Sequence, residues 1–219
     1  HVLPTFKVPR SWNLIRSFDW GSSKPWAVTY GFETNGEQPD ANMLGGMKIP
    51  FIPKGSFVVP TEIYGWTGTI NEGDRAISSQ IASRVLGVDN ALLTEYNTRC
   101  IPGPADTSIY EVKDGKSIGG ELESHGCRWT KAYKGSGSRV AGWSIIRQML
   151  GAAKRADLES PHLYFFAPAE HHIRTLPQMQ RDKKKPEDID TDLEDHCMDS
   201  LRYMVARRLS SMKRKPVRT

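Results

Sequence analysis

Four aspartates stand in contexts that could support metal-dependent chemistry. Asp19 interrupts a run of bulky residues, "IRSFDWGSS", that otherwise reads as a strand, although aspartate is depleted in strand interiors. Asp106 ends a short apolar stretch in "PGPADTS", while Asp195 and Asp199 are four residues apart and can share one face of a helix. Carboxylate oxygens suit Mg²⁺, and two such ions can activate water and stabilise the leaving oxygen in phosphodiester hydrolysis.

Each of these carboxylates also has an ordinary structural interpretation. Asp106 could cap a turn or a helix, and Asp195 could stabilise a helix start through the helix dipole. Met198 and Leu201 indicate that Asp199 is partly buried, which is costly unless a cation or a basic side chain lies beside it. The metal-site hypothesis therefore requires that several of these residues meet in space.

Apolar periodicity and turn residues predict the elements that would position the carboxylates. A hairpin is expected in 17–33, followed by a glycine- and proline-rich connection over 34–55. The elements expected after it, in chain order, are a strand at 56–67, a helix at 74–87 closed by Gly87, a strand end within 98–110, a helix at 117–126, a strand at 127–133, a helix at 138–155 with Ser138 as its N-cap, a strand at 162–168 and a helix at 191–209.

Strands in hairpin order followed by strands interleaved with helices predict an α/β fold, in which a mixed β-sheet is flanked by α-helices. We expect a single domain over 1–219, with its core at about 10–208, a peripheral arm at 1–9 and a basic tail at 210–219. The tryptophans in predicted strands and helices are expected to pack in the core, namely Trp20, Trp26 and Trp143.

Composition excludes several classes of protein. No apolar run approaches the roughly 18–20 residues that a membrane-spanning helix needs, and the N-terminus has no signal-peptide pattern. The three cysteines lack CxxC spacing and are expected to be reduced thiols rather than a disulfide framework or a zinc site. The net charge of +5 is compatible with a polyanionic partner.

Basic residues occur in two segments that could contact nucleic acid. Lys131, Lys134 and Arg139 surround a Gly-Ser-Gly loop that could follow a phosphate backbone. A lysine run, Lys183, Lys184 and Lys185, lies just before the acidic segment that contains Asp195. A solvated loop is the alternative interpretation of this run. Because no segment resembles a base-reading helix, weak sequence preference is expected.

Four motifs, in order, resemble the nuclease domain of tailed-phage large terminase subunits. They are "RSFDWGSSKPWAV", "PGPADTSIY", "RWTKAYKGSGSRVAGWSIIRQML" and "KKPEDIDTDLEDHCMDSLRY", and together they extend from about residue 10 to 208. The resemblance implies an RNase H-like fold that cuts concatemeric double-stranded phage DNA during packaging, using clustered acids and two Mg²⁺ or Mn²⁺ ions. It implies a location in the cytoplasm of the infected bacterial host, without secretion or membrane insertion.

Matched motif by motif, the resemblance assigns metal binding and catalysis to Asp19, Asp106 and Asp199. It leaves Asp195 as an additional or alternative metal ligand, and His196 as a residue that could position water or have a purely structural role.

The resemblance also implies partners: an N-terminal ATPase domain, the small terminase subunit and the portal protein. No G-x-x-x-x-G-K-[ST] motif occurs, since "DGKS" would require a glycine where Tyr110 stands. The chain is therefore expected to be an excised nuclease domain that begins at His1. Another RNase H-like phosphoryl-transfer enzyme, such as a resolvase or transposase core, and a non-catalytic DNA-binding or docking module are the alternatives.

Overall fold

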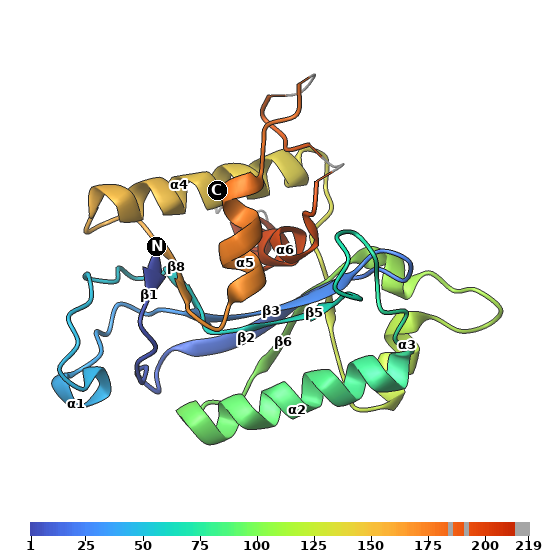
Figure 1. Ribbon diagram of the computed structural model, residues 1–219, viewed down its shortest axis with the longest axis horizontal. Coiled ribbons are helices and arrows are strands. Elements are labelled where there is room, and N and C mark those ends of the chain that lie inside the picture. Colours follow the sequence, from blue (N-terminus) through green and yellow to red (C-terminus); the bar gives the residue numbers. More distant parts are fainter. Residues whose placement is uncertain (184–185, 191–192, 213–219) are drawn as a thin grey trace, which may run out of the picture.

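The computed structural model describes residues 1–183, 186–190 and 193–212, and its strands form one mixed sheet (Figure 1). Its order is β1-β8-β4-β3-β2-β6-β7, with β5 also pairing with β3. Strands β2, β3, β4 and β5 pair antiparallel, whereas β6, β7, β8 and β1 join in parallel. The strands are β1 (Val2–Leu3), β2 (Asn13–Asp19), β3 (Trp26–Glu33), β4 (Phe57–Val59), β5 (Glu62–Gly65), β6 (Ile101–Ala105), β7 (Thr130–Lys131) and β8 (Leu163–Phe166).

Helices cover both faces of this sheet, which confirms the α/β prediction. In Figure 1, α2 (Ser78–Tyr96) and α3 (Ile118–Ser124) lie on one face, and α4 (Ser138–Arg155), α5 (Glu170–Thr175) and α6 (His196–Met212) lie on the other. The short helix α1 (Ala41–Leu44) and the 3₁₀ turns η1 (Thr107–Tyr110) and η2 (Leu176–Gln178) lie in connections. No helix among the described residues has both the length and the apolar character needed to cross a membrane.

The alternation of side chains along the strands separates two apolar clusters, one on each face of the sheet. In β3, the large side chains point to the α2 face, where they join one cluster: Trp26, Val28, Tyr30 and Phe32. The residues between them are small, and Gly31 leaves so little space below α6 that an added Cβ would lie 2.5 Å from Met204 Sδ. Small residues on this face therefore let α6 approach the sheet closely.

Hydrogen bonds between buried hydroxyl groups fix α6 on the central strands. Ser200 Oγ donates to the Ser17 carbonyl at 2.9 Å and accepts from the Thr29 backbone N–H at 3.1 Å. Ser17 Oγ in turn donates to the Ser200 carbonyl at 2.8 Å. These bonds give hydrogen-bond partners to polar groups that lie buried between the helix and the sheet, and they fix the position of α6 against β2.

Several predicted boundaries were wrong. The helix expected from residue 74 starts at Ser78, and the strand expected at 127–133 is reduced to Thr130–Lys131. Three further differences have a local reason. The strand expected at 56–67 divides into β4 and β5 around Pro60, which has no N–H for the sheet. The helix expected to end at Gly87 continues to Tyr96, because one internal glycine costs only about 1 kcal/mol. The helix expected from residue 191 starts at His196, and the first part of that range lies outside the described residues.

The N-terminal segment is more than the peripheral arm that was expected. Strand β1 pairs in parallel with β8, and Leu3, Phe6 and Val8 are buried in the cluster on the α2 face. The sequence does not predict β1, because a strand of two residues is too short to show an alternating pattern. Of the basic tail expected at 210–219, residues 213–219 lie outside the described part of the chain.

Candidate metal-dependent active site

The first two carboxylates lie at the same end of the sheet because β2 and β6 are parallel neighbours. Asp19 is the last residue of β2, and the backbone N–H of Asp106, one residue beyond β6, donates to the Phe18 carbonyl at 2.9 Å. Asp106 also has the capping role considered as its alternative, since its Oδ1 accepts from the Ser108 N–H at 2.7 Å. The carboxyl ends of neighbouring parallel strands are where α/β folds commonly form their sites.

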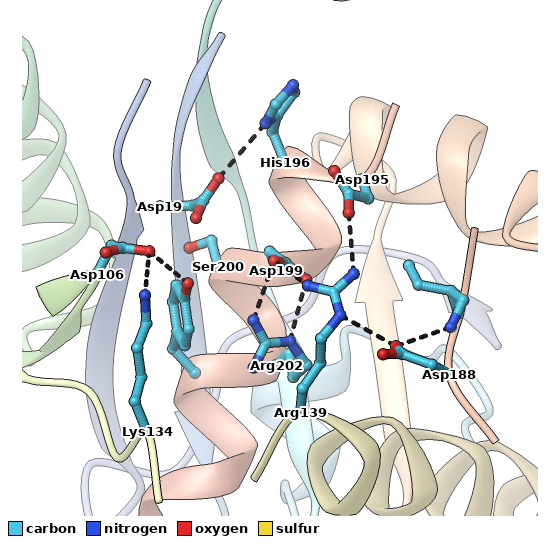
Figure 2. A network of polar contacts seen from close by, with 12 residues as sticks. Asp19, Asp106, Lys134, Arg139, Asp188, Asp195, His196, Asp199, Ser200 and Arg202 are labelled. Atoms are coloured by element: carbon cyan, nitrogen blue, oxygen red, sulfur yellow. Dashed lines mark hydrogen bonds and ion pairs between the residues drawn. The ribbon is translucent and has the colours of Figure 1, made fainter. Parts of the chain in front are cut away.

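The third carboxylate comes from α6, which the serine network holds against β2. Asp199 is in the first turn of α6, and Asp195 immediately precedes the helix rather than lying within it. The Asp199 N–H donates to the Asp195 carbonyl at 2.7 Å, so Asp195 forms the start of the helix backbone ladder. Figure 2 shows Asp19, Asp106 and Asp199 arranged around the same region, which is the juxtaposition that the metal-site hypothesis requires.

Burial and mutual repulsion disturb the ionisation of two of these groups. Burial raises the pKa of Asp19 to about 7; the contact with His196 opposes this rise, while the negative charges of Asp199 and Asp106 add to it. Burial raises the pKa of Asp195 to about 6, with repulsion from Asp199 as the next contribution. Repulsion between neighbouring carboxylates therefore adds to the effect of burial in both groups.

Asp106 differs from Asp19 because donors surround it. Lys134 Nζ and Tyr203 Oη donate to its Oδ2 at 2.8 and 2.6 Å. Burial alone would raise the pKa of Asp106, but these bonds and those with Ser108 outweigh it and lower the pKa to about 2. Asp106 is therefore an anion throughout the neutral range.

Two arginines neutralise Asp199. Arg202, one turn along α6, binds it bidentately, with Nε to Oδ1 and Nη2 to Oδ2 both at 3.0 Å. Arg139, at the start of α4, donates from Nη1 to Oδ2 at 2.8 Å and also contacts Asp195 at 3.3 Å and Asp188 at 3.0 Å (Figure 2).

His196, the first residue of α6, lies beside Asp19. Its Nδ1 is 3.5 Å from Asp19 Oδ2, and its Nε2 is buried without a hydrogen-bond partner in the part of the chain that the structure describes. Burial would lower the pKa of His196, but the Asp19 carboxylate outweighs this and raises it. An unpartnered ring nitrogen beside a buried carboxylate leaves a position for a water molecule or a substrate group.

The basic residues singled out as DNA contacts have different surroundings. Lys134 and Arg139 pair with the carboxylates, whereas Lys131 Nζ lies 5.1 Å from the centre of the Tyr110 ring and is exposed. Lys183 is exposed, and Lys184 and Lys185 lie outside the described residues. A helix start at Ser138 was expected from capping, but the N-cap is Gly137 in the left-handed region, with φ of 75°.

Sequence reasoning assigned no role to Arg202, Tyr203 or Asp188, although all three stand in the quoted motif "KKPEDIDTDLEDHCMDSLRY". The spacing of Asp199 and Arg202 is a helical i,i+3 pair and was a usable signal. No signal in the sequence linked Tyr203 to Asp106, because that contact joins two distant elements.

The donor chemistry of this site fits divalent cations. Carboxylate oxygens are the ligands that Mg²⁺ and Mn²⁺ prefer, and a cation would offset the burial and the repulsion that raise the pKa of Asp19. Within the described ranges, however, no group of three or more His, Cys, Asp and Glu side chains forms a ready-made metal site. The oxygens of Asp106 and Asp199 are directed to Lys134, Arg139 and Arg202 instead.

The central strands, the helices on both faces and the carboxylates at the strand ends define an RNase H-like fold. Solved structures share it: the nuclease domain of the P22 large terminase has a TM-score of 0.59 and 14% identity, covering 98% of this chain and 92% of that one. The large terminase of a thermophilic bacteriophage has a TM-score of 0.60 and 16% identity, covering 95% of this chain.

This chain spans 43% of that thermophilic-phage large terminase, so it corresponds in fold to part of that protein. No protein-family model matches the sequence, and no curated protein matches it. At these identities the likeness is one of fold.

Proposed function

We propose that this chain is the nuclease domain of a tailed-phage large terminase, a metal-dependent endonuclease that cuts concatemeric double-stranded DNA during genome packaging. The proposal is carried by the approach of Asp19, Asp106 and Asp199 at one end of an RNase H-like sheet. It is supported by the fold shared with the P22 nuclease domain over almost the whole of both chains.

In this proposal Asp19, Asp106 and Asp199 hold two Mg²⁺ or Mn²⁺ ions, with Asp195 as an additional or alternative ligand. When bound, the ions supply Lewis acidity, which activates the attacking water and stabilises the leaving oxygen of the cleaved phosphodiester. Strand β2 and helix α6 fix the positions of Asp19 and Asp199, because the hydrogen bonds of Ser200 join the two elements.

Other side chains of the site bind substrate and move protons. His196, held through Nδ1 beside Asp19, can keep a water in place or accept a proton at its unpartnered Nε2. The exposed Lys131 and Lys183, together with Lys184 and Lys185, supply phosphate contacts that do not depend on base sequence. Lys134 joins them when a DNA phosphate competes with Asp106 for its ammonium group.

The proposed partners of the complete protein are the N-terminal ATPase domain, the small terminase subunit and the portal protein, in the cytoplasm of an infected bacterium. These follow from the proposed terminase role, since this chain corresponds to less than half of the thermophilic-phage large terminase.

The test is cleavage of plasmid and linear concatemeric DNA with Mg²⁺, Mn²⁺ or EDTA. The wild type should cut with either metal and not with EDTA. Asp19→Asn, Asp106→Asn and Asp199→Asn should each lower the rate by at least about 100-fold, because each removes a ligand of the reacting metal ions. If one variant cuts at the wild-type rate, that residue is not a required ligand.

A matched control is Asp40→Asn. Asp40 caps α1, where asparagine caps equally well, so the variant should retain wild-type cleavage. Faster cutting of branched DNA than of linear duplex would favour a resolvase-like enzyme instead. DNA binding without cleavage in either metal would favour a docking module.

A further inference from the structure

Arg139 makes an unusual set of contacts for a residue expected to bind DNA. Its guanidinium group reaches three carboxylates at once, Asp188, Asp195 and Asp199, at 3.0, 3.3 and 2.8 Å (Figure 2). Even with Arg202 beside Asp199, three carboxylates face two guanidinium groups, so the cluster has more negative than positive groups. The Arg139 guanidinium group therefore offsets the repulsion among the carboxylates of Asp188, Asp195 and Asp199.

The oxygen atoms of Asp199 do not have equal capacity for a new ligand. Asp199 Oδ2 accepts from both Arg139 Nη1 and Arg202 Nη2, which accounts for the two lone pairs of that oxygen. Asp199 Oδ1 accepts from Arg202 Nε. A metal ion that binds Oδ2 must therefore displace one of the two arginines.

Arg139 is the arginine that can leave. The side chain of Arg202 is 5% exposed, and its Cγ lies against the backbone of Gly142, where an added Cβ would be only 2.6 Å away. The side chain of Arg139 is 29% exposed. The residue lies just after the turn at 135–137, whose last residue, Gly137, has a left-handed backbone. Arg202 is thus locked by packing, whereas Arg139 has room to move towards solvent.

We propose that Arg139 is a built-in counter-cation that competes with divalent metal ions for Asp195 and Asp199. The inference depends on the proposed metal-dependent function and adds a determinant of metal affinity within this chain. Without metal, Arg139 holds Asp195 and Asp199 together; a metal ion that binds Asp199 Oδ2 takes that oxygen from Arg139. The metal concentration at which the site fills is therefore set by the charge at position 139.

The test is calorimetric titration of the DNA-free protein with Mn²⁺, comparing wild type with Arg139→Gln and Arg139→Lys. Arg139→Gln should bind Mn²⁺ about ten-fold more tightly, the effect of one charge on a dication at about 6 Å in a water-like dielectric. Arg139→Lys keeps the charge and should stay within about two-fold of wild type. The control, Arg155→Gln, removes a charge from the last turn of the same helix and should leave the affinity unchanged.

Thermal unfolding supplies a second measurement. The rise in melting temperature produced by Mn²⁺ should be larger for Arg139→Gln than for wild type, because the metal replaces the missing positive charge. The inference is overturned if Arg139→Gln binds Mn²⁺ no more tightly than wild type. It is also overturned if Arg139→Gln and Arg139→Lys change the Mn²⁺ affinity equally, because that result indicates a packing role of Arg139. If wild type still binds Mn²⁺ and cuts DNA, the proposed function stands. Absence of Mn²⁺ binding in wild type and in both variants would overturn the inference and the metal-dependent function together.

Discussion

The charge of Asp19 should make the metal-free protein less stable at neutral pH, and Asp19→Asn tests this directly. Burial raises the pKa of Asp19 from 3.8 to about 7 in the folded protein. The folded state therefore holds a proton on Asp19 between about pH 4 and 7 that the unfolded state has released. Stability from this group is fully present below pH 4 and is lost as the pH rises to about 7.

A shift from 3.8 to about 7 corresponds to at most roughly 4 kcal/mol. Asparagine has the same shape without the charge. We expect Asp19→Asn to be more stable than wild type by about 2–4 kcal/mol at pH 8 in EDTA, with a much smaller difference at pH 4.

Urea unfolding with EDTA at pH 4, 6 and 8 measures this difference. Adding Mn²⁺ at pH 8 should stabilise the wild type more than Asp19→Asn, and so reduce or reverse the difference, because only the wild type has the proposed carboxylate ligand. The reasoning is refuted if Asp19→Asn is no more stable than wild type at pH 8, or if the difference between them does not change with pH. Asp40→Asn is again the matched control, and it should not be more stable than wild type at pH 8, because asparagine only replaces aspartate as the cap of α1.

Three further substitutions test the contacts around the carboxylates. Tyr203→Phe removes the hydrogen bond to Asp106 and should cost about 1 kcal/mol in urea unfolding and raise the pKa of Asp106, followed by NMR titration. Lys134→Met should also raise the pKa of Asp106, and the salt dependence of duplex binding should lose about one unit of slope if Lys134 contacts phosphate. Ser200→Ala leaves the Thr29 N–H unpaired between α6 and the sheet, and should lower the free energy of unfolding by about 1–3 kcal/mol.

Each of these predictions has a distinct contrary result. An unchanged Asp106 pKa in Tyr203→Phe or Lys134→Met would show that the donors do not determine its ionisation. For Ser200→Ala, the half-buried Ser144 of α4 offers the control Ser144→Ala, whose only described hydrogen bond joins it to an exposed glutamine. If Ser200→Ala and Ser144→Ala lower the free energy of unfolding equally, the hydrogen bonds of Ser200 to the sheet contribute no more than an ordinary surface contact.

Much of the fold could be predicted from the sequence, because it depends on local patterns. The bulky runs of β2 and β3, the turn residues between them and the apolar stripe of α6 identify strand, turn and helix directly. Prediction failed at boundaries where neighbouring signals conflict: Pro60 interrupts one strand and Gly87 fails to end a helix. At Pro60 the missing N–H ends the pairing of the strand, whereas at Gly87 the cost of one internal glycine is too small to end the helix.

The sequence by itself determined which acids are candidates and in which order they occur along the chain. Only the tertiary structure decided that the carboxylates of Asp19, Asp106 and Asp199 approach one another, because this requires two parallel strands and a helix bound across them. It also decided that Lys134 and Arg139 face these acids rather than solvent alone. Electrostatic pairing depends on distance through space, and the spacing of residues along the chain carries no measure of that distance.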